Sequence, residues 1–156
     1  MFGFLKRKPR EVYAPVDGKL MPLESVNDEV FSQKMAGDGV AILPIGDTFV
    51  APIDGVITKI FSTNHAFSVK SKQDLEVLVH IGLETVALKG EGFKRLAKEG
   101  DEVKVGDPII RVDLDYISAN AKDIITPVLV TDESKYKDID KKRNVVKSGD
   151  TIMEVK

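Results

Sequence analysis

Turn-forming dipeptides of aspartate and glycine recur along the chain and divide it into short segments. Asp-Gly occurs at 17–18, 38–39 and 54–55, and the positions of Gly-Asp include 37–38, 46–47, 106–107 and 149–150. Glycine supplies the positive φ that tight turns require, and the aspartate side chain caps such turns. Between the turns lie short apolar runs with strand character. This pattern predicts an all-β protein, an antiparallel β-sandwich or barrel-like fold with short helical turns.

The apolar runs give the expected elements. We expect strands near 19–23, 40–44, 48–51, 55–61, 66–70, 75–80, 85–88, 109–112, 126–130 and 152–155. A helical pattern occurs only at 92–98, at 114–123 and in part of 132–141. None of these helical stretches is long enough to organise the fold.

Two sequence motifs occur twice. "APVDGKLMPL" at 14–23 returns as "APIDGVITKI" at 51–60, and "VKVGDPIIRV" at 103–112 returns as "VKSGDTIMEV" at 146–155. The spacings differ and the repeats interleave, which excludes a solenoid of fixed period. We therefore expect one β motif used twice, a duplicated hybrid motif that gives a pseudo-symmetric pair of sheets.

Length and charge narrow the class of protein. A chain of 156 residues is most simply one domain, which we place at 12–156 after a flexible tail at 1–11. The net charge of −2 and the few aromatic residues argue against a nucleic-acid binder. The absence of cysteine excludes disulfides, thiolate metal sites and cysteine catalysis, and it fits a reducing compartment. We expect a cytoplasmic protein whose basic tail makes at most weak contact with an anionic membrane.

The two histidines of the chain fall at the ends of one predicted hairpin. "HAFSVK" and "LEVLVH" flank the turn-like "SKQD", and a turn centred there places His65 directly opposite His80. In that register Val77 and Val79 lie on one face of their strand, and His80 lies on the other. Two imidazoles held so close indicate histidine chemistry.

Several kinds of histidine chemistry stay open at this point. A neutral imidazole can act as a nucleophile, as a general base or as a metal ligand. Thr63 is placed to orient His65 through a hydrogen bond, and a second imidazole can donate an N–H to an oxyanion on the first. Zinc at His65 and His80 is an alternative, although no carboxylate spacing marks further ligands. No phosphate-binding glycine loop and no serine nucleophile motif is present.

Six segments, in this order, resemble the glucose-type enzyme IIA domains of the bacterial phosphoenolpyruvate-dependent sugar phosphotransferase system. They are "PVDGKL", "FSQKMAGDGVAILP", "VAPIDGVI", "TNHAF", "VLVHIGLETVALKGEGF" and "EGDEVKVGDPII", and the resemblance covers roughly residues 12–156. It implies a β-sandwich and a phosphotransferase component that works through a phosphohistidine. By this resemblance, Nε2 of His80 accepts phosphate from the histidine-containing phosphocarrier protein and passes it to a cysteine of an enzyme IIB domain.

The resemblance also implies roles for other residues. His65 matches the second histidine, which stabilises the phosphate and supports onward transfer, and Thr63 matches its hydrogen-bonding neighbour. No cofactor is required, and zinc at the histidine pair remains an alternative. A docking surface for protein partners is implied at Asp28, Phe31, Met35, Phe61, Leu78, Glu84 and Val86. Leu78 stands where some relatives carry an aromatic residue, and Glu84 where many carry aspartate.

Two other readings compete with this one. The glycine turns at 51–60 and 99–113 resemble biotinyl or lipoyl carrier domains, but "RVDLDYISANAK" offers no modifiable lysine in a hairpin. A zinc peptidase of related β architecture needs a further ligand motif, which the chain lacks. The identity of the sugar, the cognate permease and any regulatory partner cannot be inferred from the sequence.

Overall fold

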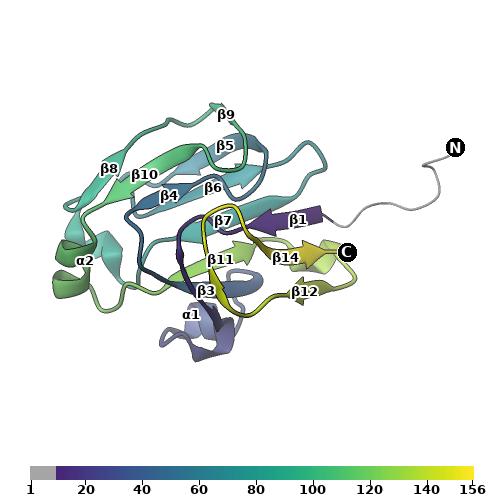
Figure 1. The fold of residues 1–156 in the computed structure, drawn as a ribbon, viewed down its shortest axis with the longest axis horizontal. Coiled ribbons are helices and arrows are strands. Elements are labelled where there is room, and N and C mark those ends of the chain that lie inside the picture. Colours follow the sequence, from purple (N-terminus) through teal and green to yellow (C-terminus); the bar gives the residue numbers. More distant parts are fainter. Residues whose placement is uncertain (1–9) are drawn as a thin grey trace, which may run out of the picture.

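Antiparallel sheets make up most of the computed structural model, which describes residues 10–156 (Figure 1). The large sheet has the order β13-β2-β3-β11-β7-β6-β5-β9, with bounds Val145–Val146, Gly18–Pro22, Asp38–Pro44, Thr126–Val130, Glu76–His80, Ala66–Lys70, Gly55–Ile60 and Glu102–Val103. One small sheet has the order β1-β14-β12, with bounds Arg10–Tyr13, Thr151–Val155 and Ile139–Lys141. The other has the order β4-β10-β8, with bounds Thr48–Val50, Pro108–Val112 and Phe93–Arg95.

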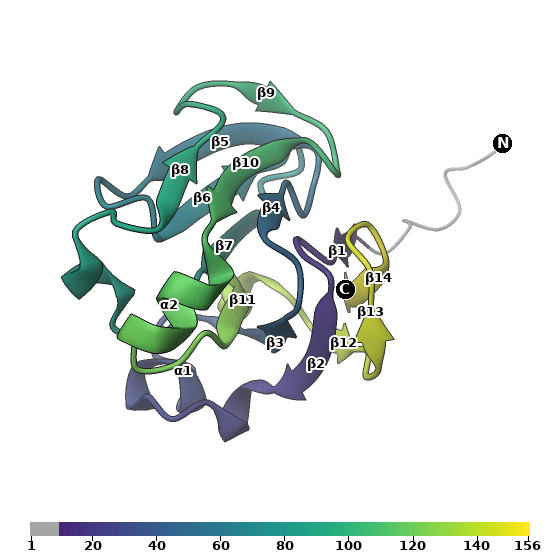
Figure 2. The same ribbon diagram turned by 60° about the vertical axis from the view of Figure 1, so that its left-hand side comes forward.

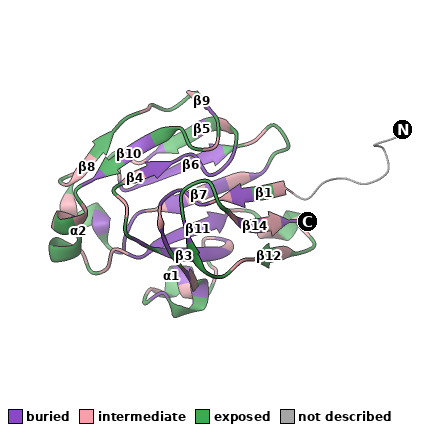
Figure 3. Ribbon diagram, viewed as in Figure 1, coloured by how far each residue is buried: buried purple, intermediate pink, exposed green. Residues whose placement is uncertain are grey.

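The small sheets pack on one face of the large sheet and enclose the main core. This core takes buried side chains from all three sheets, among them Phe49, Phe67, Val77, Ile110 and Met153. Figure 3 shows the buried residues concentrated on the strands of these layers. Within residues 10–156 no sheet closes on itself, so the expected all-β sandwich is confirmed in its open form.

The repeated motifs occupy equivalent places at the two ends of the large sheet. Gly18 on β2 pairs with Val146 on β13, and Gly55 on β5 pairs with Val103 on β9. The preceding aspartates match as well, because Asp17 accepts from the Ser148 amide at 2.7 Å and Asp54 accepts from the Val105 amide at 2.8 Å. The predicted duplication is thus confirmed in the backbone pairing.

Glycine is required where each repeated strand begins. A Cβ on Gly18 would collide with the Leu43 carbonyl oxygen, and a Cβ on Gly55 would collide with that of Lys70. Each strand therefore approaches its neighbour more closely at this position than any residue with a side chain would allow.

Short helices fill the connections. They are α1 (Glu29–Ser32), α2 (Leu114–Asn120) and the 3-10 helices η2 (Leu23–Ser25), η3 (Thr85–Leu88) and η4 (Glu133–Lys135). The helix expected at 114–123 is confirmed over 114–120. The helix expected at 92–98 is wrong, because 93–95 form β8, and the strand expected at 85–88 is η3.

α1 covers a small second core on the outer face of the large sheet. Leu23, Val26, Phe31, Ala41, Leu83, Ile125 and Leu129 are buried there. The helices and strands from Arg10 to Lys156 include no helix long and apolar enough to cross a membrane. Arg10 and Glu11, which we expected in the tail, pair with β14 in β1. The rest of the expected tail and its membrane contact lie outside the described residues.

Candidate active site

His80 is the last residue of β7, and its side chain lies on the outer face of the large sheet. Val77 and Val79 on the same strand are buried in the main core, as the alternation predicted. The His80 Nδ1 atom lies 2.8 Å from the Gly82 carbonyl oxygen. A carbonyl oxygen only accepts hydrogen bonds, so Nδ1 carries the proton and donates it. The Nε2 atom is left with a free lone pair.

The position of the Gly82 carbonyl group is set by the backbone conformation of the turn that follows β7. Gly82 has φ 77°, and a Cβ there would lie 2.7 Å from Thr85 Cγ2 and 2.8 Å from the Asp123 carbonyl oxygen. Only glycine fits this turn without strain, and the turn aims the carbonyl back at His80. The sequence interpretation did not include this residue, although a glycine two positions after the histidine was visible in "HIG".

The predicted pairing of His65 with His80 is wrong by one residue. His80 pairs with Ala66 and Val79 with Phe67, because the turn has a three-residue loop at 72–74 in which Asp74 has φ 66°. Such a loop ends in a left-handed residue and shifts the register by one relative to an even-numbered loop. His65 therefore lies outside β6, in the connection from β5.

The histidines nonetheless meet, because the β5–β6 connection curls over the end of the sheet. Asn64 has φ 61°, and its amide donates to the Phe61 carbonyl at 2.7 Å. This tight turn directs the His65 ring toward His80, with ring centroids 5.0 Å apart and planes at 77°. The side chain of Thr63 hydrogen-bonds to Nδ1 of His65, as predicted from the sequence.

Two phenylalanines extend the pair into a row of four rings. The Phe61 centroid lies 5.4 Å from that of His65, and the Phe31 centroid lies 4.9 Å from that of His80. Both contacts are tilted or edge-on, a favourable geometry for aromatic groups. His65 is only 4% exposed, whereas His80 is partly exposed. The arrangement presents one imidazole to solvent and holds the second behind it.

The apolar surroundings favour uncharged imidazoles. Burial, and to a smaller extent the neighbouring His80, lowers the pKa of His65 from its usual 6.5 to about 4. Burial also lowers the pKa of His80, against the opposing effects of the Gly82 carbonyl and the Asp28 carboxylate. Both rings are therefore neutral at physiological pH, and neutral imidazole is the nucleophilic form.

The remaining predicted residues divide into those near the rings and those on flanking segments. Asp28 accepts a hydrogen bond from the Val30 amide at 3.0 Å and caps α1, and it lies close enough to act on the pKa of His80. Leu78 is half-buried beside the outer core. Met35 and Val86 are exposed by 71% and 57%, just after α1 and within η3.

Two further features concern the expected docking surface. Glu84 has φ 56°, and its carboxylate lies 3.7 Å from Lys122 Nζ, an ion pair that the sequence interpretation did not include. Val30, 45% exposed on α1, is a further apolar side chain of this region that was missed. The use of these side chains to bind a partner stays a prediction.

The site does not form a complete metal centre by itself. Among residues 10–156, no three His, Cys, Asp or Glu side chains gather as a metal-binding group. His65 and His80 offer two imidazole nitrogens, whereas protein-bound zinc takes three or four protein ligands. Glu76, on the same face of β7 as His80, is hydrogen-bonded to Thr58 Oγ1 at 2.8 Å. The donor set does not fit a resident zinc ion.

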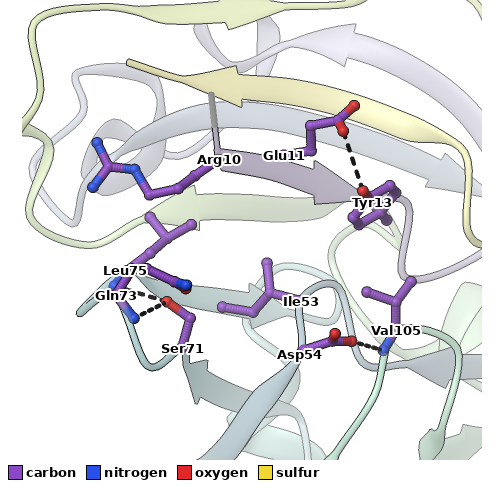
Figure 4. A pocket seen from close by; sticks show the side chains of 9 residues that line it. All are labelled: Arg10, Glu11, Tyr13, Ile53, Asp54, Ser71, Gln73, Leu75 and Val105. Carbon is purple, nitrogen blue, oxygen red and sulfur yellow. Dashed lines mark hydrogen bonds between the residues drawn. The ribbon is translucent and has the colours of Figure 1, made fainter. Parts of the chain in front are cut away.

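A separate concavity of about 380 Å³ lies at the turn end of the β6–β7 hairpin, away from the histidines (Figure 4). Ser71 and Asp54 contribute polar oxygens to it. The Ser71 hydroxyl accepts from the Gln73 and Leu75 amides, and Asp54 accepts from the Val105 amide. These oxygens already accept hydrogen bonds that stabilise turns of the fold, and no histidine lines the concavity.

Known proteins with related sequences identify the family to which the chain belongs. Residues 10–136 match the family model of the phosphoenolpyruvate-dependent sugar phosphotransferase system, EIIA 1. The PTS system glucose-specific EIIA component of Haemophilus influenzae is 47% identical over 98% of this chain and 93% of its own length. That of Buchnera aphidicola subsp. Acyrthosiphon pisum is 43% identical over 96% of this chain and 93% of its own length.

A third relative is a longer protein, and a solved structure matches the fold. The N-acetylglucosamine-specific EIICBA component of Klebsiella pneumoniae is 46% identical over 79% of this chain, which corresponds to 19% of that protein. The glucose permease IIA from Mycoplasma capricolum has a TM-score of 0.90 and 37% identity, with full coverage of both chains. The chain therefore belongs to the EIIA 1 family of the phosphoenolpyruvate-dependent sugar phosphotransferase system.

Proposed function

We propose that His80 is the residue that carries the phosphoryl group in this phosphotransferase component. The observation that supports this most directly is the hydrogen bond from His80 Nδ1 to the Gly82 carbonyl, because it leaves the Nε2 lone pair free to attack phosphorus. The phosphohistidine of the phosphocarrier protein is the donor. Its phosphorus–nitrogen bond breaks as the bond from phosphorus to His80 Nε2 forms.

The second step reverses the roles of the groups. A cysteine thiolate of an enzyme IIB domain attacks the phosphorus, the bond to His80 Nε2 breaks, and the nitrogen regains its lone pair. The name of the Klebsiella relative, EIICBA, joins an A component to a B component in one protein and supports this choice of partner. We place the relay in the cytoplasm.

His65 serves the onward step as a neutral donor that stabilises the phosphoryl group on His80. If the Thr63 hydroxyl donates to Nδ1 of His65, the imidazole proton resides on Nε2, where it can hydrogen-bond a phosphoryl oxygen on His80. A neutral donor stabilises the charge without a strong ion pair, which would retain the phosphate. The depressed pKa of His65, near 4, keeps the ring in this form at neutral pH.

Partners dock on the surface around His80. We assign to it the apolar side chains Phe31, Met35, Phe61, Leu78 and Val86, with Asp28 and Glu84 at the rim. Met35 and Val86 are the exposed apolar side chains of this set, and exposed apolar side chains beside charged ones are typical of transient interfaces. An acidic rim suits a basic partner surface and speeds encounter.

The test is a transfer assay with phosphoenolpyruvate, enzyme I and the phosphocarrier protein. We expect an acid-labile phosphate on the wild type and none on His80→Gln. His65→Gln should accept phosphate and pass it slowly to an enzyme IIB domain. Labelling of His80→Gln as strong as that of the wild type would refute the assignment.

A further inference from the structure

A second set of contacts holds the turn that carries Thr63 and His65. β8 belongs to the small β4-β10-β8 sheet and lies beside the end of the β5–β6 hairpin (Figure 2). From β8, Arg95 Nε donates to the Asn64 Oδ1 atom at 2.9 Å, and Arg95 Nη2 donates to the Phe61 carbonyl at 3.4 Å. One guanidinium thus contacts the turn near both of its ends.

A neighbouring side chain reinforces this contact. Glu99 follows β8, and its carboxylate accepts from the Ile60 amide at 2.9 Å. The strand next to β5 on this edge, β9, pairs only with Gly55 and Val56, so within residues 10–156 Ile60 has no strand partner on that side. Segment 95–99 therefore holds residues 60–64 in place through hydrogen bonds that cross between the two layers of the sandwich.

These hydrogen bonds bear on the position of His65 through Asn64. Asn64 stands between Thr63 and His65 and holds the left-handed conformation, φ 61°, that turns the His65 ring toward His80. A planar guanidinium fixes the orientation of its acceptors better than a single amine does. Arg95 is exposed and lies outside both cores, so loss of this contact should leave the fold intact.

We propose that Arg95 is a positioning residue, which acts through Asn64 to hold His65 at the distance and orientation needed for phosphoryl transfer from His80. The kinetic part of this proposal rests on the function proposed above, whereas the structural part does not. His80 is held by its own bond to Gly82. Arg95 should therefore matter little for acceptance and much for onward transfer, in which His65 stabilises the phosphoryl group as its bond to His80 breaks.

The test compares Arg95→Ala, Asn64→Gly and the double variant. Glycine adopts the left-handed conformation readily, so Asn64→Gly removes the acceptor and keeps the turn. Each single variant should slow transfer to enzyme IIB by about tenfold or more, since small misplacements near a reacting centre have effects of this size. Acceptance should stay within about twofold of the wild type. The double variant should transfer phosphate to enzyme IIB no more slowly than Arg95→Ala, because the two substitutions remove the same hydrogen bond.

Lys94→Ala is the matched control, since Lys94 is a neighbouring exposed cation on β8. It should transfer like the wild type, and Arg95→Lys, which keeps one donor, should fall between the wild type and Arg95→Ala. An additive double variant, or onward transfer at the wild-type rate in Arg95→Ala, would overturn the proposal.

An NMR measurement tests the positioning role of Arg95 independently of the proposed function. The ¹⁵N chemical shifts of the His65 ring report its tautomer without any phosphate. We expect one tautomer in the wild type and in Lys94→Ala, and a mixture in Arg95→Ala and Asn64→Gly. If the wild type takes no phosphate, the proposed function fails, and the shifts alone decide whether Arg95 orders His65. Identical shifts in all four proteins would refute the positioning role.

Discussion

Burial of His65 as a neutral imidazole makes the stability of the fold depend on pH. The pKa of His65 is about 4 in the folded chain and 6.5 in its usual state. Between these values the unfolded state binds more protons than the native state, so the free energy of unfolding falls as the pH falls. With these two pKa values, the linkage relation gives a loss of about 2–3 kcal/mol between pH 7.5 and pH 4.5.

The assay is urea unfolding followed by far-ultraviolet circular dichroism at both pH values, for the wild type and for His65→Gln. Glutamine does not titrate, whereas His80 and the carboxylates change in both proteins and cancel in the comparison. With a urea m-value of about 2 kcal/mol/M, the wild-type midpoint should fall by about 1 M more than that of His65→Gln. Equal losses in the two proteins would show that His65 is not buried as a neutral ring.

Three further predictions follow from the geometry of the site. Gly82→Ala should lower the free energy of unfolding by about 2–3 kcal/mol and slow acceptance. Gly100 is also at positive φ, but no atom of the described residues lies within 4 Å of an added Cβ, so Gly100→Ala should lower the free energy of unfolding by only about 1 kcal/mol. Equal losses in urea melts of the two variants would contradict this. Thr63→Val should leave acceptance unchanged and slow transfer to enzyme IIB at least about fivefold, because it removes the hydrogen bond to His65; an unchanged rate in single-turnover transfer would count against it. Chelation with EDTA should leave acceptance unchanged, and excess zinc should inhibit it by binding the imidazole nitrogens; loss of activity on chelation alone would point to a required metal.

The sequence allowed prediction of the features that local pattern determines. Asp-Gly turns and alternating apolar residues predicted six of the eight strands of the large sheet but missed the two-residue edge strands β9 and β13. The doubled motif predicted the pseudo-symmetry of the sheet, which the pairs Gly18–Val146 and Gly55–Val103 confirm. The close approach of the two histidines was also predicted. The reason given for it was wrong, because one left-handed residue in the turn, Asp74, shifts the register of the hairpin.

Tertiary contacts decided the elements that the sequence pattern missed. Residues 93–95 have helical character locally but pair with β10, which overrides the local preference. Residues 85–88 look like a strand but lie between two left-handed residues, Glu84 and Lys89, which confine them to a single 3-10 turn. The contacts of Arg95 with Asn64 join segments 31 positions apart and have no local sequence signal.

The nitrogen of the His80 ring that carries the phosphoryl group decides whether His80 works as proposed. The bond from Nδ1 to the Gly82 carbonyl leaves only Nε2 free, so the phosphoryl group should be on Nε2 of His80. The ¹⁵N and ³¹P spectra of the protein phosphorylated through enzyme I and the phosphocarrier protein identify the modified nitrogen. We expect a single phosphohistidine signal from His80 Nε2, with Nδ1 still protonated. A phosphate on His80 Nδ1, or on His65, would contradict the account.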